Sequence, residues 1–251
     1  MSARRVDALP SGIMNAVGAF LLLTLTSPAG QATRDSLARE AEYETRRLAL
    51  VQSIQARGVR DSATLEAMRR VPRHEFVLAR DRAIAYGDHP LPIGHGQTVS
   101  QPYIVAYMTE LLRPRPGLRV LEVGTGSGYQ SAVLARIGCT VRTIEIFQSL
   151  ADRARERLHR LGYRGIAMRH GDGHFGWQEE APFDAIIVTA TAGYIPPKLI
   201  EQLKPGGRMV IPVGSAEGVQ NLILVDKARN GRIQTRRLLP VRFVPLLEGT
   251  H

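Results

Sequence analysis

Short apolar runs alternate with helical patterns along the second half of the chain. The runs at 118–123, 140–145, 167–170 and 183–188 predict strands, and the last is apolar on both faces, as in a buried parallel strand. The alternation predicts an α/β fold: a doubly wound, mostly parallel, Rossmann-like sheet preceded by N-terminal helices. We expect the final strands at 208–213, 222–225 and 241–244, with an antiparallel pair among them.

The first half of the chain favours helices. Ser36 is placed to cap a helix that runs to about Arg57. A second helix is predicted over 64–70, with Asp61 or Ser62 as its cap.

The segment between these helices and the first strand combines a loop with a third helix. Closely spaced prolines and glycines predict a loop over 88–96. Ser100 is placed to cap the next helix, with Pro102 in its first turn and an end near Leu112. Beyond the first strand, helices are predicted at 131–137 and 195–203.

A glycine-rich turn follows the strand at 118–123. It reads Gly124-Thr125-Gly126-Ser127-Gly128, and glycine lets the backbone approach a ligand closely because it has no Cβ. The GxGxG spacing differs from the GxGxxG of a dinucleotide site. Glu122, just before the turn, suits a cationic or hydroxyl-rich ligand better than a diphosphate.

Acidic residues end the next two strands. Glu145, about twenty residues past the turn, is placed to accept hydrogen bonds from ribose hydroxyls. Asp172, in Gly171-Asp172-Gly173, is placed to accept one from an adenine amino group. A glycine turn, a Glu and an Asp in this order predict an S-adenosylmethionine (SAM) site. The predicted cofactor-binding residues in these segments are Gly124, Thr125, Gly126, Gly128, Glu145, Asp172 and Gly173.

From about residue 50 to its C-terminus, the chain resembles the protein-L-isoaspartate O-methyltransferase family. The glycine turn is shared by many methyltransferases, whereas GQTVSQPY at 96–103 is far more specific. The chain departs from the family in its basic charge and long N-terminal extension. The matching segments are VPRHEFV (71–77), GQTVSQPY (96–103), MTELL (108–112), LEVGTGSGY (121–129), GDG (171–173), APFDAIIVTA (181–190), QLKPGGRMVIPVG (202–214) and VRFVPL (241–246).

The resemblance implies a SAM-dependent enzyme that repairs proteins. The methyl group goes to the free α-carboxylate of an L-isoaspartyl residue in a damaged protein or peptide. The ester then closes to a succinimide, which reopens partly to normal aspartate.

The chemistry of this transfer limits what the site must supply. The nucleophile is a carboxylate with an ordinary pKa of about 3.5, so it is ionised at neutral pH and needs no general base. Catalysis then reduces to proximity and alignment. The Ser100 hydroxyl is placed to donate to one carboxylate oxygen while the other faces the methyl carbon. Spacing alone supports a helix-cap role and a catalytic role for Ser100 equally, whereas the resemblance favours the catalytic role.

Two segments are predicted to bind substrate. Gln97, Thr98 and Val99 lie in the same loop as Ser100, with Thr98 close enough in sequence to serve the cofactor as well. Pro212 and Val213 are expected to form part of the peptide-binding wall.

Composition bounds the partners. The 251 residues carry a net charge of +10, mostly from dispersed arginines rather than one basic run, so we expect no nucleic-acid partner. The single cysteine, Cys139, excludes an intrachain disulfide and argues against a cysteine metal site, so we predict no metal. We predict a monomer whose partners are isoaspartyl proteins and peptides.

The N-terminal residues form a separate question. Arg4 and Arg5 precede an apolar stretch at 13–25 and small residues at 27–32, which is the pattern of a secretory signal. The stretch is short for a transmembrane helix. SAM is made in the cytoplasm, and the resemblance favours that compartment, which we predict. An exported protein, a membrane-surface anchor and a misassigned start codon remain alternatives.

The expected domain organisation follows from these patterns. Residues 1–32 form a signal-like or disordered leader, and 33–251 form one methyltransferase domain. Within it, 33–116 hold the helices and active-site loop, and 117–251 hold the SAM-binding sheet and the C-terminal strands.

Two rival functions stay open. A nucleic-acid methyltransferase of this fold often carries an Asn/Asp-Pro-Pro-aromatic turn after the fourth strand, where this chain has Thr189-Ala190-Thr191-Ala192. A non-catalytic SAM-binding relative is disfavoured because both the glycine turn and the segment at 97–103 are intact.

Overall fold

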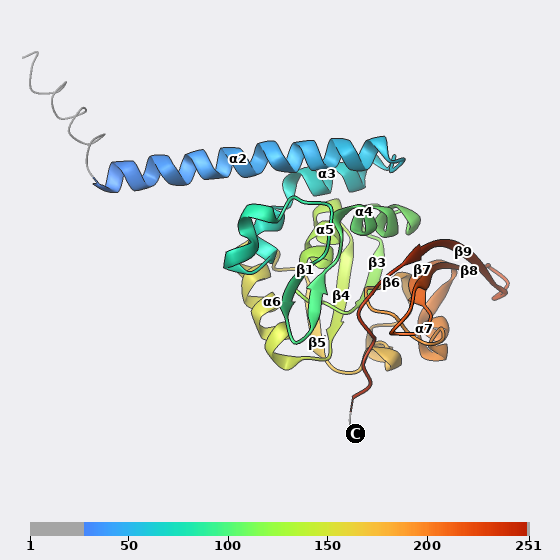
Figure 1. Cartoon of the computed structure of the whole chain (residues 1–251). Coiled ribbons are helices and arrows are strands. Elements are labelled where there is room, and N and C mark those ends of the chain that lie inside the picture. Colours follow the sequence, from blue (N-terminus) through green and yellow to red (C-terminus); the bar gives the residue numbers. More distant parts are fainter. Residues whose placement is uncertain (1–27, 250–251) are drawn as a thin grey trace, which may run out of the picture. The chain divides into compact units, whose positions relative to one another are not determined.

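The computed structural model describes residues 28–249 (Figure 1). The chain divides into two compact units, residues 1–45 and 46–251, and helix α2 (Pro28–Ala56) crosses that boundary. Most of the predicted leader lies outside the described residues, and its last five residues, 28–32, begin α2. The predicted division at 32/33 stays a prediction. In the described part of the chain, no helix has the length and apolarity to cross a membrane.

The second unit is built on a seven-stranded sheet in the order β5-β4-β3-β6-β7-β8-β9 (Figure 1). The five strands from β5 to β7 pair in parallel, and β7–β8 and β8–β9 pair antiparallel, which confirms the α/β prediction and the antiparallel ending. The strands are β3 (Arg119–Val123), β4 (Thr140–Glu145), β5 (Ala167–His170), β6 (Phe183–Val188), β7 (Leu203–Val213), β8 (Gln220–Lys227) and β9 (Ile233–Val241).

Helices connect the parallel strands, because a parallel pair needs a crossover between its members. Helix α5 follows β3, α6 follows β4 and α7 follows β6, and α3 packs against both α4 and α5. The helices are α3 (Ser62–Arg70), α4 (Pro102–Leu111), α5 (Tyr129–Ile137), α6 (Gln148–Arg160) and α7 (Pro197–Gln202), with short 3₁₀ turns η1 (Arg73–Phe76), η2 (Ala79–Ile84), η3 (Gly173–Phe175) and η4 (Gln178–Glu180).

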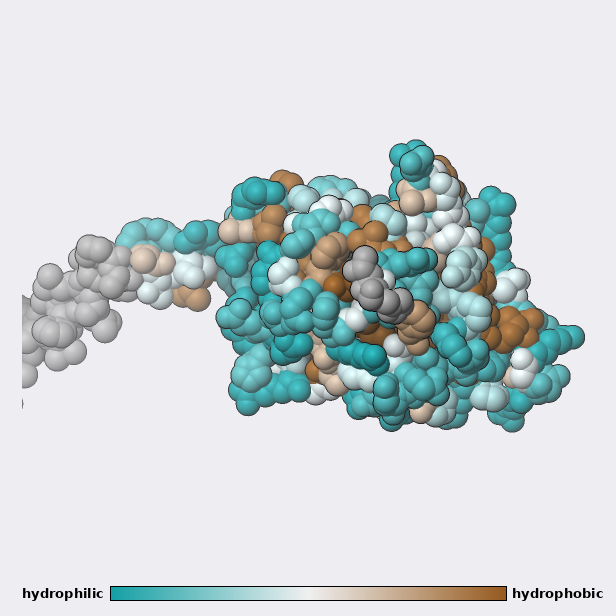
Figure 2. All heavy atoms as spheres, turned by 90° about the horizontal axis from the view of Figure 1, so that it is seen from below, coloured by the Kyte–Doolittle hydropathy of each residue, from teal (hydrophilic) through white to brown (hydrophobic). Residues whose placement is uncertain are grey.

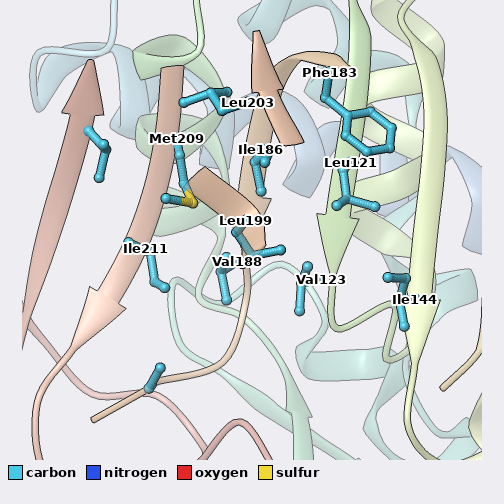
Figure 3. Packing of buried hydrophobic residues seen from close by; sticks show 12 residues of the cluster. Leu121, Val123, Ile144, Phe183, Ile186, Val188, Leu199, Leu203, Met209 and Ile211 are labelled. Carbon is cyan, nitrogen blue, oxygen red and sulfur yellow. The ribbon is translucent and has the colours of Figure 1, made fainter. Parts of the chain in front are cut away.

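The hydrophobic core lies between the central strands and the segments that connect them. Leu121, Ile186 and Met209, from β3, β6 and β7, are fully buried and pack in one cluster (Figure 3). In β6, five of the six side chains are buried, as its two-sided apolar sequence predicts.

Local signals fix some helix ends and miss others. Asp61 caps α3, with its carboxylate accepting from the Thr64 amide at 2.7 Å, as predicted. The prediction that Ser36 begins a helix is wrong, since α2 starts at Pro28. Proline at a first helical position is preorganised and needs no N–H partner, so the helix extends back past the serine.

The region predicted as a loop contains a strand. Strands β1 (Leu91–Gly94) and β2 (Gln97–Val99) form an antiparallel hairpin inside and after the expected loop at 88–96. Its turn residues His95 and Gly96 have φ of 53° and 68°, the left-handed pair that two-residue hairpins require.

The last strand was also misplaced. A strand was predicted at 241–244, whereas β9 spans Ile233–Val241 and pairs with β8 along its length. Its side chains are mostly exposed at the sheet edge, including Arg236 and Arg237, so no apolar run marks residues 233–237.

The buried core gives a stability prediction. Ile186→Ala should lower the free energy of unfolding by about 2–5 kcal/mol, because it removes buried methylenes and leaves a cavity. Val219→Ala, at a side chain that is 55 % exposed, is the control and should cost much less. Urea denaturation of both variants tests this, and equal losses would contradict the assignment of Ile186 to the core.

Candidate active site

Two adjoining hollows lie where the parallel strands end. The first is a cleft of about 500 Å³, and the second is a smaller hollow of about 280 Å³. The first cleft is lined by the residues immediately after β3, β5 and β6, which are Gly124, Gly171 and Thr189. Glu145, at the end of β4, lines it as well. The two hollows share the wall residues Thr98, Gly124, Gly126 and Thr189.

The cleft has an apolar wall that the sequence did not predict. The C-terminal segment 244–247 lines it opposite the glycine turn, and a bridge from Thr191 to Pro245 holds this segment beside β6. On the face shown in Figure 2, hydrophobic residues gather near the centre, within a largely hydrophilic surround. The match at 241–246 was a signal for this wall, but its position at the cleft depends on the fold.

The glycine turn comes too close to its neighbours for side chains. Gly124 has φ of 95°, and a Cβ there would lie 2.4 Å from the Thr189 Oγ1. That hydroxyl donates to the Gly124 carbonyl at 2.6 Å and joins the ends of β3 and β6. Gly128, with φ of 87°, caps α5 and packs on Leu158 instead of lining either hollow. The turn therefore presents backbone to the cleft at Gly124 and Gly126.

Glu145 stands at the centre of the cleft. It is almost fully buried, and its carboxylate accepts from the Gly126 amide at 2.7 Å and the Phe147 amide at 3.0 Å. These bonds fix the carboxylate beside the glycine turn, where it can accept hydroxyl groups of a ligand. Thr125 faces the second hollow, and its hydroxyl lies 2.6 Å from that of Thr143.

Asp172 is turned towards its own neighbours. Its carboxylate accepts from the His174 amide and ring Nδ1, at 2.8 and 2.9 Å, and from the Gly249 amide at 2.8 Å. Burial alone would raise the pKa of this carboxyl, but these hydrogen bonds outweigh burial and lower it. Asp172 does not itself line the cleft, whereas Gly173 does.

Ser100 lies in the second hollow with Val99 and Thr98. The prediction that Ser100 caps a helix is wrong, because α4 has Gln101 at its N-cap and no side-chain cap bond. The Asp88 carboxylate instead accepts from the Tyr103 amide at 2.8 Å. The half-buried Ser100 hydroxyl makes no hydrogen bond within residues 28–249, so it is available to a ligand.

Other predicted substrate residues are placed differently. Gln97 lines the first cleft. Pro212 and Val213 line neither hollow, and the Pro212 carbonyl accepts from the Ala192 amide at 3.2 Å. They anchor the loop that follows β6.

Glu122 precedes the glycine turn and has no role among the binding residues predicted from the sequence. It is fully buried in the wall of the second hollow, where the Ser131 hydroxyl donates to one carboxyl oxygen. Its other oxygen, Oε1, has no partner in the described part of the chain. Burial raises the pKa of this carboxyl to about 8, and the nearby charge of Glu145 acts in the same direction. At neutral pH a mainly uncharged carboxyl therefore stands buried in the wall of the second hollow.

The donor set is one of backbone, hydroxyl and carboxyl groups. Across residues 28–249, no cluster of three or more His, Cys, Asp or Glu side chains is placed to hold a metal ion. What the site offers is a pair of buried carboxyls, one beside each hollow.

Known proteins match this chain over most of its length. The family model described as protein-L-isoaspartate(D-aspartate) O-methyltransferase (PCMT) matches residues 45–251. A curated protein-L-isoaspartate O-methyltransferase 2 of Syntrophobacter fumaroxidans is 53% identical over 243 residues, covering 92% of this chain and 97% of its own. A protein-L-isoaspartate O-methyltransferase of Opitutus terrae is 59% identical over 190 residues, covering 76% of this chain and 81% of its own.

Solved structures agree in fold. A protein-L-isoaspartate O-methyltransferase superposes with a TM-score of 0.72 at 28% identity, over 79% of this chain and 65% of that one. A putative enzyme of the same name from Plasmodium falciparum, in complex with S-adenosyl-L-homocysteine, gives a TM-score of 0.70 at 28% identity, over 81% of this chain and 99% of that one.

The buried carboxyl predicts a pH dependence of stability. The pKa of Glu122 in the folded protein, about 8, lies above its value in the unfolded chain. The contribution of the protonated carboxyl to the free energy of unfolding is therefore complete below the unfolded pKa. It is then lost as pH rises through the folded pKa. Glu122→Gln cannot ionise, so its melting temperature should fall less than that of the wild type between about pH 4.5 and 8. Calorimetry of the ligand-free proteins tests this, and parallel profiles would contradict the shift.

Proposed function

Because this chain belongs to the protein-L-isoaspartate O-methyltransferase family, we propose that it methylates damaged proteins from SAM. The acceptor is the free α-carboxylate of an L-isoaspartyl residue in a protein or peptide. The observation that carries the proposal is the free Ser100 hydroxyl, in a hollow that shares its wall with the cofactor cleft.

The residues of the first cleft fit SAM. Gly124 and Gly126 offer backbone at a close approach, and Glu145 offers carboxylate oxygens to ribose hydroxyls. In the wall of the adjoining second hollow, the buried Glu122 carboxyl lies where a cationic group of the molecule would favour its ionised form. SAM supplies an electrophilic methyl group on a sulfonium. Thr98 stands at the wall between the two hollows, where it serves cofactor and substrate.

Ser100 is the proposed catalytic residue. Its hydroxyl donates to one oxygen of the substrate carboxylate, which leaves the other oxygen directed at the methyl carbon. The carboxylate is already ionised, so the protein needs to hold and orient it rather than to remove a proton. We also assign substrate contacts to Gln97 and Val99, which flank Thr98 in the chain.

The product leaves the repair incomplete. The backbone nitrogen attacks the ester carbonyl, and the C–OCH3 bond breaks with loss of methanol to give the succinimide. The free carboxylate closes far more slowly, because it would have to expel hydroxide. Hydrolysis of that ring returns part of the material to normal aspartate.

The setting of the enzyme is part of the proposal. SAM is a cytoplasmic metabolite, so we place the protein in the cytoplasm. We also propose that it acts as a monomer.

Replacement of Ser100 tests this function directly. Ser100→Ala should keep SAM affinity and lose about 10- to 150-fold in turnover of an isoaspartyl peptide, since a hydrogen bond to a charged group contributes about 1.5–3 kcal/mol. Radiolabel transfer from SAM measures turnover, with the aspartyl isomer of the peptide as the substrate control. Calorimetric titration measures SAM binding.

Ser53→Ala is the matched control, an exposed serine of α2 outside both hollows, and should behave as the wild type. Normal turnover of Ser100→Ala would disprove the catalytic role. Absence of transfer to the isoaspartyl peptide by the wild type, with SAM still bound, would disprove the proposed function.

A further inference from the structure

Arg73 is a fully buried cation directly behind the active-site loop. Its side chain has no exposed surface, and it lies at the start of η1. Burial lowers the pKa of this guanidinium, and Tyr129 and Asp88 offset that effect. No carboxylate makes an ion pair with it among residues 28–249. A charge held in this way is costly, so its contacts are informative.

The guanidinium joins three segments of the chain at once. Its Nε donates to the Ala85 carbonyl at 2.9 Å, and its Nη2 donates to the Ser100 carbonyl at 2.9 Å and the His89 carbonyl at 3.4 Å. A planar fork of donors can reach carbonyls in different directions at once, whereas an ammonium on a flexible stem cannot hold the same geometry.

The same guanidinium also lies over the side chain that follows the glycine turn. Its Cζ lies 4.9 Å from the centre of the Tyr129 ring. Tyr129 is the first residue of α5, directly after the glycine turn, and lines the second hollow with Ser100. Burial raises the pKa of Tyr129 to about 12, so the ring stays neutral beside the cation. Arg73 therefore touches both the loop that carries Ser100 and the element that carries the glycine turn.

Asp88 secures the other side of the Ser100 loop. Its carboxylate accepts from the Gln101 side chain at 2.9 Å and from the Tyr103 amide at 2.8 Å. Ser100 is thus held through its carbonyl by Arg73 and through its following residues by Asp88, and its hydroxyl stays free.

We propose that Arg73 is the positioning residue that fixes Ser100 relative to the cofactor turn. The inference rests on the proposed role of Ser100. Arg73 does not touch substrate; it acts by holding the Ser100 backbone against Tyr129, so that the hydroxyl meets the substrate carboxylate at the correct distance from the methyl donor.

A double-mutant cycle tests this coupling. Arg73→Lys keeps the positive charge but loses the fork, so kcat for an isoaspartyl peptide should fall at least tenfold while SAM affinity changes less than threefold. In the Ser100→Ala background, the same substitution should lower kcat less than twofold, because the hydroxyl it positions is already absent.

Arg47→Lys is the matched control. Arg47 is another nearly buried arginine, which donates to the Tyr86 hydroxyl at 3.2 Å, and its recorded contacts do not include the segment at 97–103. It should lower the melting temperature and leave kcat close to that of the wild type. If Arg73→Lys does not fold, Arg73→Met replaces it, since an apolar side chain avoids the cost of a buried charge. The same losses in kcat are then expected.

The outcomes separate the two claims. Equal losses from the Arg73 substitution in both backgrounds, or unchanged kcat in the wild-type background, would overturn the positioning role. Wild-type turnover of Ser100→Ala alone would overturn the proposed function of Ser100 and this inference with it. Loss of SAM affinity in parallel with kcat would show a general structural role instead.

Discussion

The common end of the parallel strands is the constraint on which the site depends. Strands paired in parallel place their carboxyl ends at one edge, so the turns after β3, β4, β5 and β6 must converge there. Convergence leaves little room, and Gly124 lies so close to Thr189 that any side chain would collide with it. Backbone at Gly124 and the carboxylate of Glu145 therefore line the cleft where these turns meet.

The site is also where the fold keeps its costly buried polar groups. Glu122, Glu145 and Arg73 are each almost or completely buried, although such groups are stable only when they are paired or neutralised. Glu145 accepts from backbone amides, and Arg73 donates to carbonyls through Nε and Nη2, although its Nη1 has no partner in the described part of the chain. Glu122 accepts from one hydroxyl, and its raised pKa favours the neutral form. The apolar cluster around Leu121 supplies the stability that tolerates these groups.

Ser100 shows how a local motif is changed by distant residues. A serine before Pro102 is a good helix cap, and a capping serine would have its hydroxyl engaged. Asp88, from the upstream loop, takes over the amide of Tyr103, and Arg73 takes the Ser100 carbonyl. Other residues thus bind the backbone groups at the start of the helix, and the Ser100 hydroxyl makes no hydrogen bond within residues 28–249.

The sequence by itself determined the parallel strands, the glycine turn and the family, because strand periodicity and short motifs are local signals. It also drew attention to Gly124, Gly126, Glu145 and Ser100, which sit beside such signals and which line the two hollows. It did not reveal β9, whose exposed side chains carry no apolar pattern, or the wall at 244–247. Only the tertiary structure decided that the Asp172 carboxylate binds groups outside the cleft, and that Asp88 accepts from the amide of Tyr103 at the start of α4. Those outcomes depend on contacts such as Gly249 with Asp172 and Asp88 with Tyr103, between residues separated along the chain.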